Sequence, residues 1–539
     1  AAADRIVIAP QDLRTADPTR ASEIYAGRFA FAGKVVMCEG RSPFRITPPS
    51  TEWAEMLAGF GWLRHLRAAD SNVTRAQARA LIDQWIAAQG RWNAVSWRPE
   101  IVARRVIAWI THAPFILGDA DARFYRRFLR NLTRQVRFLR RTVKVLRDGL
   151  PRLQAICALT YAALCMAGQA RLMRFATQRL VDELQRQILP DGGHISRNPG
   201  VLIELLLDLL PLRQAFGARN LTPPPALVNA IDRMMPMLRF FRHGDGSFAT
   251  FNGMGPTPPD LLATVLAYDD ARGRPVANAA HSGYQRLEAP GVVVLMDTGV
   301  PPPMALSQEA HAGCLSFEFS AGRHRIVVNC GLPVLGREGW RHFARTTAAH
   351  STLTFAGLSS CRFLLSPRLQ RLVGAPVLEG PTEVPVTREQ LADGVRVRAA
   401  HDGYANRCGI VHERTVTLSA DGRRLDGVDV LRPAPSARRP RRGPDTYAVR
   451  FHLHPAVAAR VLTHRNAVML MLPNRDVWTF EAHEHPVTLE ESVYLAGPHG
   501  PQKTRQIVIH GRARQTPRVA WSFVLMDPSE TQRLARLQA

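Results

Sequence analysis

Residues 309–353 read EAHAGCLSFEFSAGRHRIVVNCGLPVLGREGWRHFARTTAAHSTL, and they decide the fold of this 539-residue chain. Two short apolar runs, Leu315–Phe319 and Ile326–Val328, predict a pair of antiparallel strands with a turn at Ala321–Gly322. A histidine lies on either side of this pair. Because paired strands bring residues that are distant in sequence within side-chain reach, we expect the polar residues around them to gather at one site.

Strand-like patterns recur through the rest of the C-terminal half. From Val292 to Met526, short runs of β-branched and aromatic residues are separated by turn residues, which is typical of an antiparallel β-sandwich. The N-terminal half instead repeats apolar residues every three or four positions, which predicts helices. Since 539 residues exceed one compact core, we expect a multidomain α+β protein with a helical part followed by a sandwich.

Two segments of the helical half have distinctive patterns. Apolar residues over 53–66 fall on one face and predict a single helix. Residues 123–147, RFYRRFLRNLTRQVRFLRRTVKVLR, contain ten Arg or Lys and no acid, and they predict an amphipathic helix with one arginine face. That face is either solvated or attracts a polyanion. The tryptophans at Trp92, Trp97 and Trp109 fit helix packing better than they fit platforms for sugar rings.

The composition is strongly basic, with a net charge of +25. Such a charge attracts acidic polysaccharide, nucleic acid or an anionic membrane surface, and it also serves solubility in an arginine-rich chain. No helix-turn-helix, zinc-finger or RNA-stacking signature accompanies it, so a nucleic acid is not the expected partner. No run of about 18 apolar residues predicts a membrane span. The sequence does not indicate an oligomeric state.

Seven cysteines are scattered through the chain without any CxxC motif. This arrangement is not a disulfide framework, and free thiols favour a reducing compartment. The first residues lack the basic-then-apolar pattern of a signal peptide. We therefore expect a cytoplasmic protein, or a periplasmic one if a signal peptide was removed.

Three motifs in and around the opening stretch resemble the C-terminal half of the heparinase II/III family of polysaccharide lyases. The chain reads EAHAGCLSF at 309–317, NCG at 329–331 and RTTAAHST at 345–352. The family typically reads H-x-H-x-D-x-x-S-F, then D-x-G, then R-x-T-x-x-H-N-T. The resemblance implies an (α/α) toroid followed by an antiparallel β-sandwich.

The resemblance extends over roughly residues 50–530. It implies the toroid at 51–275 and the sandwich at 276–539. The residues before it, 1–50, lack a regular pattern and predict an irregular N-terminal extension with a short strand at Phe29–Val36. The chain departs from the family pattern in the opening stretch, where Glu309 replaces the first histidine, and Gly313 and Asn329 replace the two aspartates.

Two loops of the helical half resemble family loops that line the substrate cleft. The first is ILPDGGHISRNP at 188–199, in which Asn198 takes the position of a serine and is also suited to cap the following helix. The second is FFRHGDGSFATFNG at 240–253, in which Phe248 replaces a tyrosine that transfers a proton. The resemblance, together with the polar residues near these motifs, points to catalysis by Asn198, His194, His243 and Glu309, and to substrate binding by Arg197, Arg345 and Tyr284.

The resemblance also implies a zinc ion beside the cleft. Its ligands would be His311, Asn329 and His350. Zinc prefers imidazole, thiolate and carboxylate, and an amide is a poor ligand. The alternative is that the two histidines only form hydrogen bonds at the edge of the sandwich.

A lyase of this family removes the proton next to a uronate carboxylate and expels the 4-linked oxygen. Its site must neutralise the carboxylate and supply a base and an acid. The leading prediction is β-elimination on an acidic, uronate-containing polysaccharide. The alternative is a degenerate member that binds polyanionic glycan without cleaving it, because a carboxylate at Glu309 opposes an anionic sugar unless it is protonated or paired. A nucleic-acid binder would rest on charge alone.

Overall fold

The computed structural model describes residues 5–270, 272–435, 443–462 and 466–529. The chain forms two compact units, called here the helical unit and the sheet unit. The helical unit comprises Ala1–Ile188, Ile203–Arg233 and Asp260–Asp270, and the sheet unit comprises Leu189–Leu202, Met234–Pro259 and Ala271–Ala539. The prediction of a helical N-terminal part followed by antiparallel sheets is confirmed.

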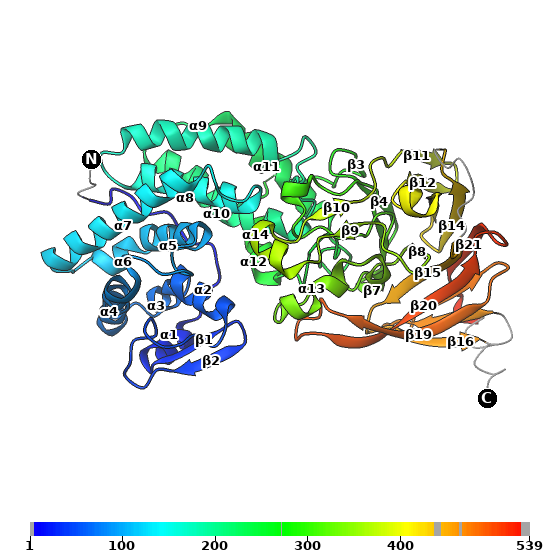
Figure 1. The fold of residues 1–539 in the computed structure, drawn as a ribbon, viewed down its shortest axis with the longest axis horizontal. Helices are drawn as coiled ribbons and strands as arrows, with labels where there is room; N and C mark the ends of the chain where they lie inside the picture. The colour runs from blue at the N-terminus through cyan, green and yellow to red at the C-terminus, as the bar shows by residue number, and fades with distance from the viewer. Residues whose placement is uncertain (1–4, 271, 436–442, 463–465, 530–539) are drawn as a thin grey trace. The chain divides into compact units, whose positions relative to one another are not determined.

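Helices account for most of the first 270 residues (Figure 1). Within the helical unit, α5 packs against α7 and α8, and α8 packs against α9. In the described part of the chain, no helix is long and apolar enough to cross a bilayer. The helices of this region are α1 (Pro18–Tyr25), α2 (Thr51–Gly59), α3 (Leu63–Ala69), α4 (Asn72–Gln89), α5 (Pro99–Thr111), α6 (Ala113–Leu117), α7 (Ala122–Thr142), α8 (Leu150–Cys165), α9 (Ala170–Gln187), α10 (Pro199–Ala218), α11 (Pro225–Phe240) and α12 (Pro259–Leu266).

The segment before residue 50 has more regular structure than the one short strand, Phe29–Val36, that the sequence predicts. Asp17 caps α1 by accepting a hydrogen bond from the Thr19 amide at 2.9 Å, and Pro18 occupies the first helical position. Strands β1 (Arg28–Phe31) and β2 (Lys34–Met37) then form an antiparallel hairpin. Short-range capping and turn signals therefore produce structure within the predicted irregular extension.

The single helix predicted over 53–66 is wrong, because the structure divides this segment into α2 and α3. Phe60 has a φ of 58°, in the left-handed region, and ends α2. Its unexposed ring lies 4.8 Å from the Trp62 ring and 5.6 Å from the Trp109 ring, measured between centroids. Packing of this aromatic cluster accounts for the bend that the apolar periodicity does not reveal.

The tryptophans of the helical unit separate into two groups. Trp53, Trp85 and Trp109 are completely buried, and the Arg105 guanidinium lies 4.1 Å from the Trp85 ring centroid. Trp92 is different, since 68% of its surface is exposed. The prediction of packing residues holds for the first group and not for Trp92.

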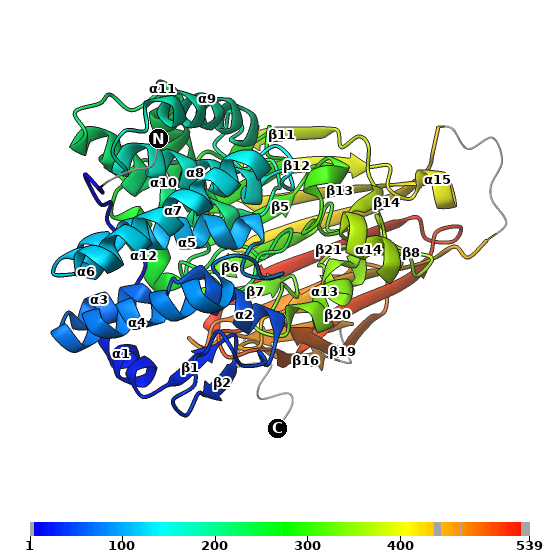
Figure 2. The ribbon, with the colours of Figure 1, turned by 60° about the vertical axis from the view of Figure 1, so that its left-hand side comes forward.

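The sheet unit contains two antiparallel sheets. In the described residues, one has the strand order β11-β12-β13-β14-β21-β18-β17-β16, and the other has the order β19-β20-β15-β7-β6-β5-β4-β3, with β8 on β15. Late strands therefore lie among early ones, as the orange and red strands do among the green and yellow strands in Figure 2. The strands are β3 (Asn278–Ala279), β4 (Tyr284–Ala289), β5 (Val292–Asp297), β6 (Phe317–Ala321), β7 (His324–Val328), β8 (Leu353–Phe355), β9 (Arg362–Phe363), β10 (Val377–Glu379), β11 (Val386–Leu391), β12 (Gly394–His401), β13 (Ile410–Ser419), β14 (Arg424–Pro433), β15 (Thr446–Leu453), β16 (Ala458–Leu462), β17 (Ala467–Met471), β18 (Val477–Ala482), β19 (Val487–Tyr494), β20 (Gln502–Arg512) and β21 (Arg518–Leu525).

The two sheets share one hydrophobic core, as a sandwich requires. Phe317 of one sheet stacks on Trp521 of the other, with 5.4 Å between ring centroids. The predicted hairpin is confirmed, because β6 pairs antiparallel with β7 and Ala321 lies opposite His324. Short helical segments connect the strands: α13 (Arg337–Arg345), α14 (Pro367–Val373), α15 (Ala405–Cys408), and the 3-10 turns Met304–Leu306 and Thr347–Ala349.

Candidate functional site

Gly253 marks a point where two distant segments of the sheet unit meet. Its φ is 95°, and a Cβ placed on it would lie 3.2 Å from Asn198 Nδ2 and 3.1 Å from Glu309 Cβ. The missing side chain therefore lets an amide and a carboxylate-bearing residue both approach the position that a Cβ would occupy. The structure thus brings together two of the residues predicted for catalysis. We define the candidate site as these three residues and their hydrogen-bonded neighbours.

Asn198 lies at the start of α10. Its Oδ1 accepts a hydrogen bond from the Gly200 amide at 2.9 Å, so it caps the helix. The other end of the amide, Nδ2, is the atom that approaches Gly253. In the same loop, His194 is only 2% exposed, and its Nδ1 lies 2.7 Å from Ser196 Oγ. The loop therefore directs the Asn198 amide toward Gly253 and keeps the His194 imidazole inside.

Arg197 is enclosed by protein groups. Its guanidinium pairs with Asp297, donates to the Ser282 carbonyl at 2.8 Å and lies 4.6 Å from the centroid of the Tyr284 ring. Burial acts to lower the pKa of Arg197, but the Asp297 carboxylate outweighs it and raises that pKa. The positive charge is therefore neutralised inside the sheet unit.

Tyr284 is hydrogen-bonded on both sides of its hydroxyl. The hydroxyl donates to the Arg197 carbonyl at 2.5 Å and accepts from Asn252 Nδ2 at 2.7 Å. Asn252 Oδ1 accepts from the His311 amide at 3.1 Å. Burial raises the pKa of Tyr284. The phenol therefore connects the loop before α10 to the segment that contains Glu309 and His311.

His243 belongs to a buried network that sequence reasoning did not predict. Its Nε2 lies 3.0 Å from Glu318 Oε1, and its Nδ1 lies 2.9 Å from Ser320 Oγ. Glu318 also accepts hydrogen bonds from the Thr250 hydroxyl at 2.5 Å and from the backbone amide of Asn329 at 2.8 Å. Burial acts to raise the pKa of Glu318, but these hydrogen bonds hold it below its ordinary value. The sequence signal is the single charged residue within the apolar strand β6.

Glu309 is the most accessible of the predicted catalytic groups. Its side chain is 45% exposed, and its carboxylate oxygens lie 3.5 Å from Arg337 and 3.4 Å from Arg341, both on α13. Arg345, at the end of α13, is buried and donates to the Ala310 carbonyl at 2.8 Å. Burial lowers its pKa to about 10. Arg345 thus holds the segment that carries Glu309 in place, while Arg337 and Arg341 neutralise the Glu309 carboxylate.

His311 and His350 form a buried pair, with His311 Nδ1 3.3 Å from His350 Nε2. His350 Nδ1 lies 2.7 Å from the Thr346 carbonyl, so it is the donor in that contact. Burial lowers the pKa of both residues, and that of His350 falls to about 4. A Cβ on Gly313 would lie 2.7 Å from His350 Cδ2. The imidazole ring therefore occupies the space that the aspartate of the family pattern would need at position 313.

The donor set implied for zinc does not fit that metal well. Asn329 Oδ1 accepts a hydrogen bond from the backbone amide of Ser351 at 2.9 Å, so the side-chain oxygen of Asn329 already has a partner inside the protein. Two imidazoles and such an amide are not the ligands that zinc prefers. Across the residues that the structure describes, no group of three His, Cys, Asp or Glu side chains is placed to hold a metal ion.

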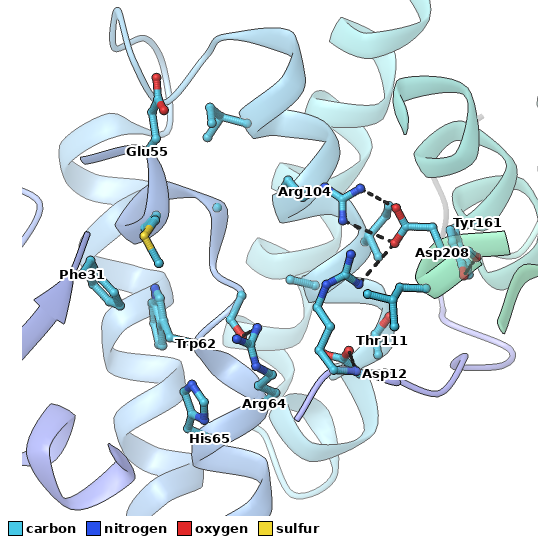
Figure 3. Close-up of a pocket in the computed structure, with 18 of the residues that line it drawn as sticks. Asp12, Phe31, Glu55, Trp62, Arg64, His65, Arg104, Thr111, Tyr161 and Asp208 are labelled. Carbon is cyan, nitrogen blue, oxygen red and sulfur yellow. Dashed lines mark hydrogen bonds and ion pairs between the residues drawn. The ribbon is translucent and has the colours of Figure 1, made fainter. Parts of the chain in front are cut away.

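The helical unit contains a separate pocket of about 360 Å³ (Figure 3). Asp208 lies on one side of it, only 1% exposed, and forms ion pairs with Arg104 and with Arg14 at 3.3 Å. In the sequence, Asp208 stands out only as one of two acids, with Glu204, in the otherwise apolar first part of α10. The apolar lining includes Phe31, Met56, Trp62, Ile101 and Ile107.

Two cations of this pocket have no carboxylate partner within the described residues. Arg64 donates to the Thr15 carbonyl at 3.0 Å and to the Gly61 carbonyl at 2.9 Å, and burial lowers its pKa. Arg20 is the second. The neighbouring His65 is neutral at pH 7, since burial lowers its pKa to about 4. The pocket therefore has cations available for an anionic group beside an apolar wall.

Comparisons with known proteins agree with this architecture. Heparinase III gives a TM-score of 0.72 at 16% identity, covering 91% of this chain and 80% of that one. A mutant of the heparan sulfate lyase HepC from Pedobacter heparinus gives 0.67 at 14% identity, covering 96% and 86%. These identities establish the fold alone. The FtsZ-localized protein C of Caulobacter vibrioides (strain NA1000 / CB15N) is 33% identical over 512 residues, which cover 94% of this chain and 87% of the relative.

Residues 271–522 match the family model described as heparinase II/III-like, C-terminal. This match spans the hairpin and the motifs around Glu309 and His350. Together with the relative that aligns along nearly the whole chain, it shows that the chain belongs to the heparinase II/III-like family.

Proposed function

We propose that this protein binds an acidic, uronate-containing polysaccharide and does not cleave it. One observation carries the proposal: the two histidines predicted for catalysis, His194 and His243, are buried and held in internal hydrogen bonds. Tyr284, predicted to bind substrate, is also occupied, because its hydroxyl has both a donor and an acceptor within the protein. Phe248, which is 1% exposed, cannot transfer a proton.

Binding does not require those groups. In the helical unit, Arg20 and Arg64 offer guanidinium groups next to the apolar wall formed in part by Trp62. A sugar ring has an apolar face and a uronate has a carboxylate, so the two kinds of group suit one residue of an acidic glycan. In the sheet unit, α13 presents Arg337 and Arg341 beside Glu309.

Cleavage by β-elimination is the competing function. It is favoured by the proximity of both Asn198 and Glu309 to Gly253, since an amide can neutralise a uronate carboxylate and a carboxylate can accept a proton. The ion pairs of Glu309 with two arginines oppose this role, because each of its carboxylate oxygens already faces a guanidinium group.

Calorimetric titration with uronate polysaccharides tests the binding proposal. The panel comprises heparan sulfate, hyaluronan, chondroitin, alginate and polyglucuronate. We expect saturable binding of at least one member, weakened about tenfold or more in Arg64→Ala, because hydrogen bonds to a charged group are worth about 1.5–3 kcal/mol. Arg475→Ala, which changes an exposed arginine of the sheet unit, is the matched control. Absence of binding to every member would contradict the proposal.

The relative from Caulobacter vibrioides suggests a second candidate function. That protein is named as FtsZ-localized, and it aligns with 94% of this chain. We propose that this chain also localises with FtsZ. Co-sedimentation of the purified protein with FtsZ filaments tests the idea. Recovery of the protein in the supernatant at all FtsZ concentrations would contradict it.

A further inference from the structure

The exposed face of α7 carries a continuous line of positive charge. Its six arginines follow one another at intervals of three or four residues, so they lie on one side of the helix. With a rise of about 1.5 Å per residue, the line extends for about 27 Å with a cation every 5 Å or so. We call it the arginine stripe, and its members are Arg123, Arg126, Arg130, Arg134, Arg137 and Arg141.

The stripe is not neutralised within the described part of the chain. None of its six guanidinium groups forms an ion pair there, in contrast to Arg127, which pairs with Asp83 at 2.6 Å on the flank of the same helix. The opposite face of α7 is fixed in the core, where Phe128, Leu132 and Leu139 are unexposed. The helix is therefore a rigid support that holds its arginines in solvent, and their mutual repulsion favours a bound polyanion.

The turn that contacts the stripe carries an exposed aromatic ring. Arg134 donates a hydrogen bond to the Arg91 carbonyl at 3.4 Å, which connects the stripe to the turn between α4 and α5. The next residue in that turn is Trp92, with 68% of its surface exposed. Trp97, five residues further on, is buried and receives the Arg134 guanidinium at 5.6 Å from its ring centroid. An indole kept in solvent next to a row of cations is suited to stack on a sugar ring.

We propose that the arginine stripe and Trp92 form a docking surface for an extended acidic polysaccharide. This inference rests on the proposed function and adds a second contact surface to it, outside both the candidate site and the helical-unit pocket. The anionic groups of the chain lie along the guanidinium groups, and one sugar ring stacks on the indole. The apolar stripe of α7 is buried, so the helix cannot insert into a bilayer as an interfacial helix does.

Other polyanions fit this surface less well. Single-stranded nucleic acid is bound by several aromatic rings on which successive bases stack, and the stripe has one exposed ring beside it. A protein partner would need a buried apolar anchor at its centre, which a row of solvated arginines does not offer. A linear, hydrophilic, anionic polymer is the ligand that the charge pattern and the single ring fit together.

The test is titration of the full chain with heparan sulfate and polyglucuronate at several salt concentrations. The variant Arg126→Glu/Arg130→Glu/Arg137→Glu reverses three charges on the solvent side of α7. The matched control, Arg460→Glu/Arg505→Glu/Arg518→Glu, makes the same change in net charge at three exposed arginines of the sheet unit. We expect at least about tenfold weaker binding and a smaller salt dependence for the stripe variant, and less than about threefold change for the control.

Trp92→Ala separates stacking from charge. We expect it to weaken binding several-fold without changing the salt dependence, and Trp92→Phe to restore most of the affinity.

Equal binding by the stripe variant and wild type would overturn this inference while leaving the proposed function intact, whereas no binding by wild type would overturn both. Equal losses in the stripe variant and the control would also overturn it, since net charge alone would explain them. Parallel titrations with a single-stranded DNA oligonucleotide and with anionic phospholipid vesicles complete the test. A stripe-dependent affinity for either that exceeds the affinity for both polysaccharides would contradict the assignment.

Discussion

Glu318 Oε1 and His243 Nε2 lie 3.0 Å apart in the interior of the sheet unit, and neither side chain is exposed. The pair ties strand β6 to the loop at 240–253, so it fixes the backbone that leads to Gly253. A histidine that the sequence suggests as a catalytic base is thereby part of the support of the site. The same carboxylate accepts hydrogen bonds from the Thr250 hydroxyl and from the backbone amide of Asn329, so one buried side chain joins the loop at 240–253 to β6 and to the end of β7.

Replacement of this carboxylate should destabilise the sheet unit. We expect Glu318→Ala to reduce the free energy of unfolding by about 3–5 kcal/mol, because it leaves the buried partners of Glu318 without an acceptor. Urea unfolding followed by tryptophan fluorescence measures the change. Glu338→Ala is the control, since that side chain is 74% exposed. A loss below about 1 kcal/mol for Glu318→Ala would show that the network does not carry this role.

The pKa of His350 makes stability depend on pH. The folded value is about 4, below the ordinary value of 6.5, because burial disfavours the charged ring. Protons therefore bind more tightly to the unfolded chain. The stabilisation is fully present above pH 6.5 and is lost as the pH falls from 6.5 to about 4, by up to about 3 kcal/mol.

His350→Gln tests this assignment, since glutamine does not titrate. We expect its free energy of unfolding to decrease less than that of wild type between pH 7 and pH 4.5. The difference can be read from urea midpoints across that range. Parallel pH profiles for the two proteins would be inconsistent with a neutral, buried His350.

Gly253 is predicted to tolerate no side chain. Its positive φ and the 3.0 Å from its ideal Cβ position to the Glu309 carbonyl mean that alanine would strain the backbone and push Glu309 away. We expect Gly253→Ala to destabilise the protein by about 1–3 kcal/mol. Gly273→Ala is the control, because nothing lies within 4 Å of its Cβ position. Equal melting temperatures for the two variants would contradict the close approach.

The ion cluster at the helical-unit pocket gives a fourth prediction. Asp208→Asn leaves Arg14 and Arg104 facing a neutral amide, so we expect a loss of about 3–5 kcal/mol in the free energy of unfolding. Glu204→Gln removes a carboxylate that is 46% exposed and should cost less than about 1 kcal/mol. Thermal unfolding of both variants checks the order, and an equal or larger effect of Glu204→Gln would reverse the interpretation.

The sequence predicts the larger features of the fold because they follow from periodicity. Apolar residues are spaced three or four apart in the first half of the chain and alternate in the second half, which predicts a helical part and a sheet part. The turn residues Ala321–Gly322 between two apolar runs predict the hairpin. The bend at Phe60 is invisible to this reasoning, since it results from the packing of an aromatic cluster and leaves the apolar spacing unchanged. Trp92 likewise differs from its neighbours only in burial, which no single residue type reveals.

The candidate site was predictable only in part. The family motifs lead to Asn198 and Glu309, and the structure places both of them against Gly253. They do not show that Arg197 is neutralised by Asp297 or that Tyr284 is hydrogen-bonded on both sides, because such partners are distant in sequence. Residue type suggested groups able to move protons, and the hydrogen-bond partners determine which of them are free to do so.

The most direct test of binding without cleavage is the ultraviolet absorbance of the unsaturated uronate that β-elimination produces. Purified protein is incubated with each polysaccharide of the panel, and its binding is verified by calorimetry in the same buffer. We predict a flat absorbance for every polysaccharide, including those that bind. A rising absorbance that is lost in Asn198→Ala would contradict this account and establish the protein as a lyase whose site includes the Asn198 amide.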